Sequence, residues 1–255
     1  MKDNQIFSRY EFKYFVNNKI SNTLYNEAQN FMKKDEHVSK DKGYFVRSLY
    51  FDNSEYHNFF EKVEGFKVRK KFRLRTYSNE LKDKNPIYLE MKGRRQDRVL
   101  KNRFRIDNDD LIYFHSLKNL DVLLNKYKNN NLINEFVYDV YKKNIKPQIL
   151  IDYNRKPLVN KNGLYFRLTF DSNLVSTKSN YLFTKNSFSF PIKYKPGYSI
   201  LEVKFERNIP AWFHRTIQGY NLNRRSISKF VLGICNCKIR EETSEKFNLF
   251  KFFNN

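Results

Sequence analysis

Alternating apolar and polar residues predict eight β-strands along this chain. The alternation has the period of two that places successive side chains on opposite faces of a sheet. The predicted strands are 9–16, 43–52, 66–77, 86–94, 98–106, 148–156, 164–171 and 199–206. Apolar residues at helical spacing predict helices in 21–34, 53–65, 107–143, 210–220 and 225–239. Ser21, and Asn53 or Ser54, are candidate helix caps. We therefore expect an α+β fold.

Charged residues gather on one face of most of these strands. Those faces carry Glu11 and Lys13; Arg69, Lys71, Arg73 and Arg75; Glu90, Lys92 and Arg94; Arg167 and Asp171; and Glu202, Lys204 and Glu206. A half-buried sheet with its polar face in water has the same alternation. However, cations about 6.5–7 Å apart along 69–75 repel one another unless an anion or carboxylates lie among them.

The helices also need an apolar surface to cover, and the apolar strand faces supply it. If the helices cover the outside, the charged faces turn inward. We therefore predict one domain over residues 1–255, an antiparallel eight-stranded closed β-barrel with a charged interior and helices packed outside.

Composition narrows the class of partner and the compartment. Lys and Arg number 49 against 27 for Asp and Glu, a net charge of +22 that attracts polyanions. Cys235 and Cys237 form a C-x-C pair, which is not a four-ligand zinc site and indicates free thiols in a reducing cytoplasm. The sequence has no secretory signal and no apolar run long enough to span a membrane, so we expect a cytoplasmic protein without a membrane segment.

Eight short motifs resemble, in order, the landmarks of the VTC domain, a branch of the triphosphate tunnel metalloenzymes related to the CYTH proteins. They are RYEFKY (9–14), VRSLYFD (46–52), KVRKKFRLRTY (67–77), YLEMKGR (88–94), YNR (153–155), FRLTFD (166–171), ILEVKF (200–205) and SKF (228–230). The resemblance spans about residues 7 to 234. It implies a polyphosphate polymerase in which the terminal phosphate of a growing chain attacks the γ-phosphate of ATP and releases ADP.

The resemblance also implies roles for individual residues. Phosphate-binding roles fall on Lys13, Arg73, Arg75, Lys92, Arg155, Arg167, Ser228 and Lys229, and a metal-binding role falls on Glu202 for Mn²⁺ or Mg²⁺. We take Arg73, Arg75, Lys92, Arg167 and Lys229 as the candidate catalytic residues. Lys71 and Lys204 join Lys13, Arg155 and Ser228 as candidate substrate-binding residues, because they share charged faces. Glu11 and Glu90 could assist the metal or could pair with neighbouring cations. Each Arg or Lys taken singly could instead be a surface salt bridge.

One position departs from the family pattern, and two other functions stay open. Some relatives carry a basic residue where this chain has Ser226, and Arg225 is the candidate substitute. A tripolyphosphatase or nucleoside triphosphatase would use the same residues with water as the attacking group. A nucleic-acid-binding protein would also be basic and rich in aromatic residues, but carboxylates on the charged faces would repel a nucleic-acid backbone. We therefore expect ATP and polyphosphate as ligands, with no specific nucleic acid; a protein partner is left open.

Overall fold

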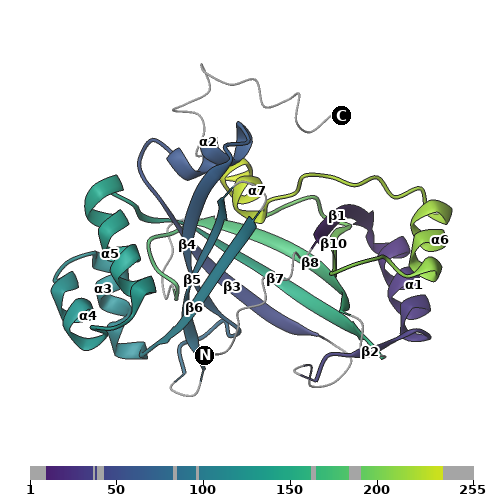
Figure 1. Cartoon of the computed structure of the whole chain (residues 1–255), viewed down its shortest axis with the longest axis horizontal. Coiled ribbons are helices and arrows are strands. Elements are labelled where there is room, and N and C mark those ends of the chain that lie inside the picture. Colours follow the sequence, from purple (N-terminus) through teal and green to yellow (C-terminus); the bar gives the residue numbers. More distant parts are fainter. Residues whose placement is uncertain are drawn as a thin grey trace.

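A computed structural model describes residues 10–36, 38, 43–82, 85–95, 98–161, 165–183 and 191–237. Arg9, the first residue of the predicted strand 9–16, lies outside these residues. All eight predicted strands are present, and they form one antiparallel sheet in the order β1-β10-β8-β7-β3-β4-β5-β6 (Figure 1). Their bounds are β1 Tyr10–Asn17, β3 Tyr44–Asp52, β4 Val68–Thr76, β5 Ile87–Arg95, β6 Arg98–Ile106, β7 Lys146–Asn160, β8 Phe166–Lys178 and β10 Tyr198–Phe205. Two short strands, β2 (Met32–Lys34) and β9 (Ile192–Lys193), pair with β7 and β8.

The sheet curls strongly, but it does not close. Glu11 on β1 lies 3.2 Å from Lys92 on β5, although these strands stand near opposite ends of the strand order. Among the described residues, β1 and β6 do not pair with each other, so the prediction of a closed barrel is wrong. We call the side of the sheet that carries Glu11 and Lys92 the inner face.

In the described part of the chain, five helices cover the outer face in two groups, one on each side of the molecule (Figure 1). On one side are α1 (Asn18–Gln29) and α6 (Ala211–Gly219), whose Leu24, Ala28 and Phe213 pack on apolar residues of β1, β8 and β10. On the other side are α3 (Leu111–Ser116), α4 (Leu120–Lys126) and α5 (Asn131–Lys143), which cover the apolar side of β3 to β6. The apolar strand faces therefore turn toward helices, as the sequence predicted.

Two of the described helices lie on the inner face, which corrects the prediction that all helices pack outside. α7 (Lys229–Asn236) buries Phe230 and Ile234 in the same cluster as Ile149 and Ile151 of β7, and α2 (His57–Val63) joins this cluster through Phe59. The fit is close, because a Cβ at Gly233 of α7 would meet Ile151 Cδ1 at 2.8 Å. An eight-stranded barrel has an interior just wide enough for side chains, whereas a helix is about 10 Å across. We infer that α7 keeps the sheet open.

Local signals at the helix starts explain two smaller differences. Asn17, not Ser21, caps α1, because its Oδ1 accepts the Ile20 N–H at 2.8 Å. At α2, Asn53 Oδ1 accepts the His57 N–H, and the buried Asp52 carboxylate accepts the N–H groups of Asn58 and Phe59. Of the described helices, none is long and apolar enough to cross a membrane.

Candidate functional site

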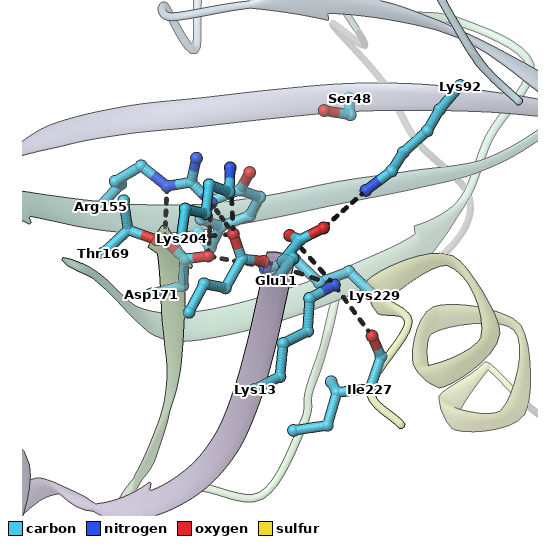
Figure 2. Close-up of polar contacts among 12 residues, drawn as sticks. Glu11, Lys13, Ser48, Lys92, Arg155, Thr169, Asp171, Lys204, Ile227 and Lys229 are labelled. Carbon is cyan, nitrogen blue, oxygen red and sulfur yellow. Dashed lines mark hydrogen bonds and ion pairs between the residues drawn. The ribbon is translucent and has the colours of Figure 1, made fainter. Parts of the chain in front are cut away.

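The inner face holds a buried cluster of alternating charges around Glu202, which we call the Glu202 cluster: Lys13, Arg155, Asp171, Glu202 and Lys229 (Figure 2). Lys229 Nζ lies 2.6 Å from both Glu202 Oε1 and Asp171 Oδ2. Arg155 binds Asp171 through two bonds of 2.6 Å and reaches Glu202 Oε2 at 3.2 Å. Lys13 lies 3.8 Å from Glu202 and donates to the Ile227 carbonyl. Buried charges are stable only when paired in this way.

Strand register brings these residues together. Glu202 of β10 stands opposite Lys13 of β1 and Thr169 of β8, and Asp171 of β8 stands opposite Arg155 of β7. Lys229 comes from outside the sheet, as the first residue of α7, directly after the capping Ser228. The cluster therefore exists only when α7 is seated on the inner face.

Burial alone would raise the pKa of Glu202, but Lys229, Lys13 and Arg155 hold that pKa well below its usual range. Burial would lower the pKa of Lys229, but Asp171 and Glu202 raise it. Both groups therefore stay charged at neutral pH. A fixed array of buried charges is preorganised to stabilise a polyanion without rearranging.

A second cluster surrounds Glu90 on β5 and comprises Arg73, Arg75, Glu90 and Arg103, which we call the Glu90 cluster. Arg73 binds Glu90 Oε2 at 2.8 and 2.6 Å, Arg75 lies 3.7 Å from it, and Arg103 lies 3.3 Å from Oε1. Burial would raise the pKa of Glu90, but Arg73 and Arg75 lower it to about 2. One carboxylate therefore holds three guanidinium groups, which leaves an excess of positive charge on this part of the inner face.

Glu11, Lys92 and Lys204 extend the Glu202 cluster along the inner face. Lys13 lies 3.6 Å from Glu11, and Lys92 lies 3.2 Å from the same carboxylate (Figure 2). Lys204 lies 3.8 Å from Glu202. Burial raises the pKa of Glu11, but the neighbouring lysines lower it to about 2. Burial lowers the pKa of Lys204 to about 8.

Tyrosines stand at one end of the row of cations on β4. Arg69, Lys71, Arg73 and Arg75 follow one another along the strand, and Tyr77 comes after Arg75. Tyr77 contacts the rings of Tyr44 and Tyr88, and the Arg103 guanidinium lies 3.4 Å from the centre of the Tyr88 ring. The end beyond Arg75 is therefore aromatic.

The opposite end of the row is cationic. Lys71 Nζ donates to Ser228 Oγ at 3.4 Å, and Lys62 of α2 donates to Ser226 Oγ at 3.1 Å. Lys71 also lies 5.0 Å from the centre of the Phe230 ring. The two ends of the inner face therefore differ in chemistry.

The structure brings most of the predicted site residues onto this one surface. The two clusters and the groups beside them contain Glu11, Lys13, Lys71, Arg73, Arg75, Glu90, Lys92, Arg155, Glu202, Lys204, Ser228 and Lys229. Arg167 stands on the same face, opposite Lys204 of β10, and its guanidinium contacts Asp35, next to the end of β2, at 2.9 Å.

Three residues that contribute to the site were not singled out from the sequence. Asp171 was on a charged face but had no role, Arg103 lies on β6, and Lys62 lies on a helix. Lys62, rather than the exposed Arg225, approaches Ser226. Sorting the strand 98–106 into its two alternating faces could have placed Arg103 on a charged face, but no local pattern could have indicated Lys62.

The donor set for a divalent cation is small. Among the described residues, no group of three or more His, Cys, Asp or Glu side chains could hold a metal ion. The Lys13 ammonium lies between the carboxylates of Glu11 and Glu202, at 3.6 and 3.8 Å. This place already suits a positive charge, and Mg²⁺ commonly binds one or two carboxylates together with substrate phosphates and water. Glu11 and Glu202 therefore fit such an ion, whereas three guanidinium groups surround Glu90.

Comparison with known proteins places the chain in a family. Residues 8–238 match the family model described as the VTC domain. No curated protein sequence matches the chain.

Among solved structures, a candidate adenylate cyclase from Bacillus halodurans has 9% identity and a TM-score of 0.48, with 97% of this chain and 100% of that chain covered. A candidate adenylyl cyclase from Hippeastrum, described as having a dominant triphosphatase activity, has 13% identity and a TM-score of 0.46, with 89% and 96% covered. A Pyrococcus horikoshii protein has 9% identity and a TM-score of 0.44, with 88% and 97% covered. At this level of similarity, no activity is transferred from them.

Proposed function

The chain belongs to the VTC domain family, and on that premise we propose that it is a polyphosphate polymerase that uses ATP. A terminal phosphate oxygen of the growing chain attacks the γ-phosphorus of ATP. The bond from the γ-phosphorus to the β–γ bridging oxygen breaks, ADP leaves, and the chain is longer by one phosphate. The family membership supports triphosphate chemistry, and the transfer to polyphosphate is our proposal.

The observation that carries this proposal is the excess of fixed cations on the inner face. Phosphoryl transfer requires positioning and charge neutralisation more than a protein nucleophile. Arg73 and Arg75 present guanidinium groups whose fork geometry suits phosphate oxygens, and the Glu90 carboxylate holds them in place. Lys13, Lys92, Lys204 and Lys229 add ammonium groups around the same space. The acceptor phosphate supplies the attacking oxygen itself.

We assign the predicted residues to four roles. Arg73, Arg75, Lys92 and Lys229 neutralise charge that develops on the transferred phosphoryl group. Lys13, Lys71, Arg155, Lys204 and Ser228 orient the phosphate chain, and Arg167, beside Asp35, helps at the periphery. Glu11 and Glu202 would hold Mn²⁺ or Mg²⁺, which would draw charge from the β- and γ-phosphates. Glu90 is proposed as the counter-ion of Arg73 and Arg75.

Carboxylates on the inner face weigh against the nucleic-acid alternative. Glu11, Asp171 and Glu202 stand among the cations, where they would repel a nucleic-acid backbone and would suit a metal-bound triphosphate. A triphosphatase would use the same residues, because its attacking water needs no different side chain.

Incubation of the protein with ATP and MnCl₂ or MgCl₂ tests the proposal directly. We expect a ladder of polyphosphate that lengthens with time on a stained polyacrylamide gel, with one ADP released for each phosphate added. EDTA should abolish both products, because the triphosphate then lacks its divalent cation. Release of ADP and free phosphate without a ladder would indicate a triphosphatase instead. Absence of ATP turnover with either metal would count against both enzymes.

Affinity for the substrate should also depend on pH through Lys204. A lysine is charged below its pKa and neutral above it, and burial lowers the pKa of Lys204 to about 8. Binding of tripolyphosphate should therefore weaken as the pH rises through about 8. Calorimetric titrations between about pH 7 and about pH 9.5 measure this change.

Lys204→Arg is the matched variant, because a guanidinium stays charged over this range. The decline in affinity should then move to higher pH. An identical pH profile in the two proteins would show that Lys204 does not cause it.

A further inference from the structure

The inner face has an aromatic end and a cationic end, and the proposed function does not use this difference. We propose that Lys62 and Lys71, with the N-terminus of α7, form a separate subsite for the acceptor polyphosphate chain at the α2 end of the inner face. This inference rests on the proposed polymerase function. It states at which end of the inner face ATP binds and at which end the acceptor polyphosphate chain binds.

The two lysines differ from the other cations of the site in their partners. Lys71 contacts Ser228 Oγ and aromatic rings, and Lys62 contacts Ser226 Oγ. Within the part of the chain that the structure describes, neither lysine forms an ion pair with a carboxylate, whereas Lys13, Lys92, Lys204 and Lys229 each lie within 4 Å of Glu11 or Glu202. Cations held near one another without carboxylates favour the binding of an anion that carries no metal ion.

The electrostatic surroundings agree with this geometry. Burial lowers the pKa of Lys71 well below its usual range, and Lys92, Arg73, Lys13 and Lys62 lower it further. Burial and the neighbouring cations Arg69, Lys13, Arg94 and Lys92 likewise lower the pKa of Lys62. The repulsion is a cost in the free protein, and a bound phosphate chain would remove it.

Helix α7 contributes to the same place. The Ser228 hydroxyl caps this helix and also accepts a hydrogen bond from the Lys71 ammonium. The positive end of the helix dipole therefore adds to the two ammonium groups, and helix N-termini of this kind bind phosphate.

The order of groups along β4 supplies the direction. Lys71 lies at the next inner position from Arg73, on the side away from Arg75 and the tyrosines. A nucleoside would suit the aromatic end, where Tyr44, Tyr77 and Tyr88 lie, because bases stack on aromatic rings. The γ-phosphate of that ATP then points toward Lys71. Because the attacking and leaving oxygens lie roughly in line, the acceptor must approach from the Lys62 side.

Lys62→Met separates this subsite from the donor site. Titration calorimetry should show affinity for a long polyphosphate reduced about tenfold, because a charge-assisted hydrogen bond is lost, and affinity for ATP changed by less than about twofold. The melting temperature of the free protein should stay the same or rise, because the substitution removes repulsion and leaves no carboxylate unpaired. A merely structural lysine would instead lower it.

Two further variants sharpen the test. Lys62→Ser combined with Ser226→Lys returns an ammonium to the same place from the other side of the contact, and it should recover most of the affinity for polyphosphate. Lys142→Met removes the same charge from an exposed position on α5 and should leave the affinity for polyphosphate unchanged. Equal weakening by Lys62→Met and Lys142→Met would overturn the subsite, because net charge alone would then explain it.

The test also distinguishes the subsite from the proposed function. If the wild-type protein binds polyphosphate but never lengthens it, the polymerase proposal fails, while the calorimetric comparison still decides the subsite. If chains do lengthen, Lys62→Met should raise KM for a polyphosphate primer about tenfold with little change in KM for ATP. A rise shared by both substrates would contradict a separate acceptor subsite.

Discussion

Replacing Arg75 with methionine is expected to lower the turnover number for ATP by about two to three orders of magnitude while the protein stays folded. Arg75 is buried and donates to Ser48 Oγ at 3.1 Å and to Tyr153 Oη at 3.3 Å. Its charge faces the space proposed for the γ-phosphate, where removal of one fixed donor raises the barrier to reaction. Steady-state ADP release, with circular dichroism as a check of folding, measures this effect.

The fold should tolerate this substitution because Glu90 has other partners. Without Arg75, Glu90 keeps Arg73 at 2.6 Å and Arg103 at 3.3 Å, so no carboxylate is left unpaired. The two lost hydroxyl contacts should lower the free energy of unfolding by about 1–3 kcal/mol.

Arg47→Met is the matched control for Arg75→Met. Arg47 lies on the outer face and binds Asp152 through bonds of 3.0 and 2.7 Å, so both variants lose a partly or fully buried arginine. Arg47→Met should lose some stability but keep its turnover. If the two variants lost turnover equally, the loss would reflect stability, and the role of Arg75 in the reaction would be wrong.

The strands and their faces could be predicted because sheet geometry is local. Side chains two residues apart share a face, so Lys71, Arg73 and Arg75 had to face the same way once 66–77 was a strand. The extension of β8 to Lys178 was missed. Ser172 and Asn173 have the composition of a turn, and Asn173 indeed has a φ of 53° within the strand.

The position of α7 could not be predicted from its own sequence. Its apolar residues show only that the helix is buried, and they suit the outer face as well as the inner one. The choice depends on long-range fit, such as the contact of Gly233 with Ile151, which no local pattern reports. The open sheet and the contact between Lys62 and Ser226 both follow from this placement.

The charge pattern predicted that carboxylates and cations would meet, but not which would pair. Glu202 was the predicted metal ligand, and Glu11 and Glu90 were predicted either to assist it or to pair with neighbouring cations. The structure separates them, because Glu90 is held by guanidinium groups while Glu11 and Glu202 share Lys13. Pairing of this kind depends on how far the sheet curls, and the curl is a property of the whole fold.

Lys229→Met should produce the largest loss of stability of the variants considered, about 3–5 kcal/mol, and should also abolish most activity. Lys229 is buried and lies 2.6 Å from both Asp171 and Glu202, so its removal leaves two buried carboxylates with one cation fewer. Urea denaturation measures the free energy of unfolding, and ADP release measures turnover.

A double-mutant cycle separates the structural role of Lys229 from its role toward phosphate. Asp171→Asn removes one of the two negative charges that Lys229 neutralises, so Lys229→Met with Asp171→Asn restores the charge balance. We expect a coupling energy of about 1–3 kcal/mol. The double variant should lose less free energy of unfolding than the sum of the losses in the two single variants. Turnover should stay low, because the Lys229 ammonium that neutralises the transferred phosphoryl group is still missing. If turnover returned together with stability, Lys229 would serve only to hold the Glu202 cluster together, and Arg155 and Lys13 would remain as the cations that act on the substrate there.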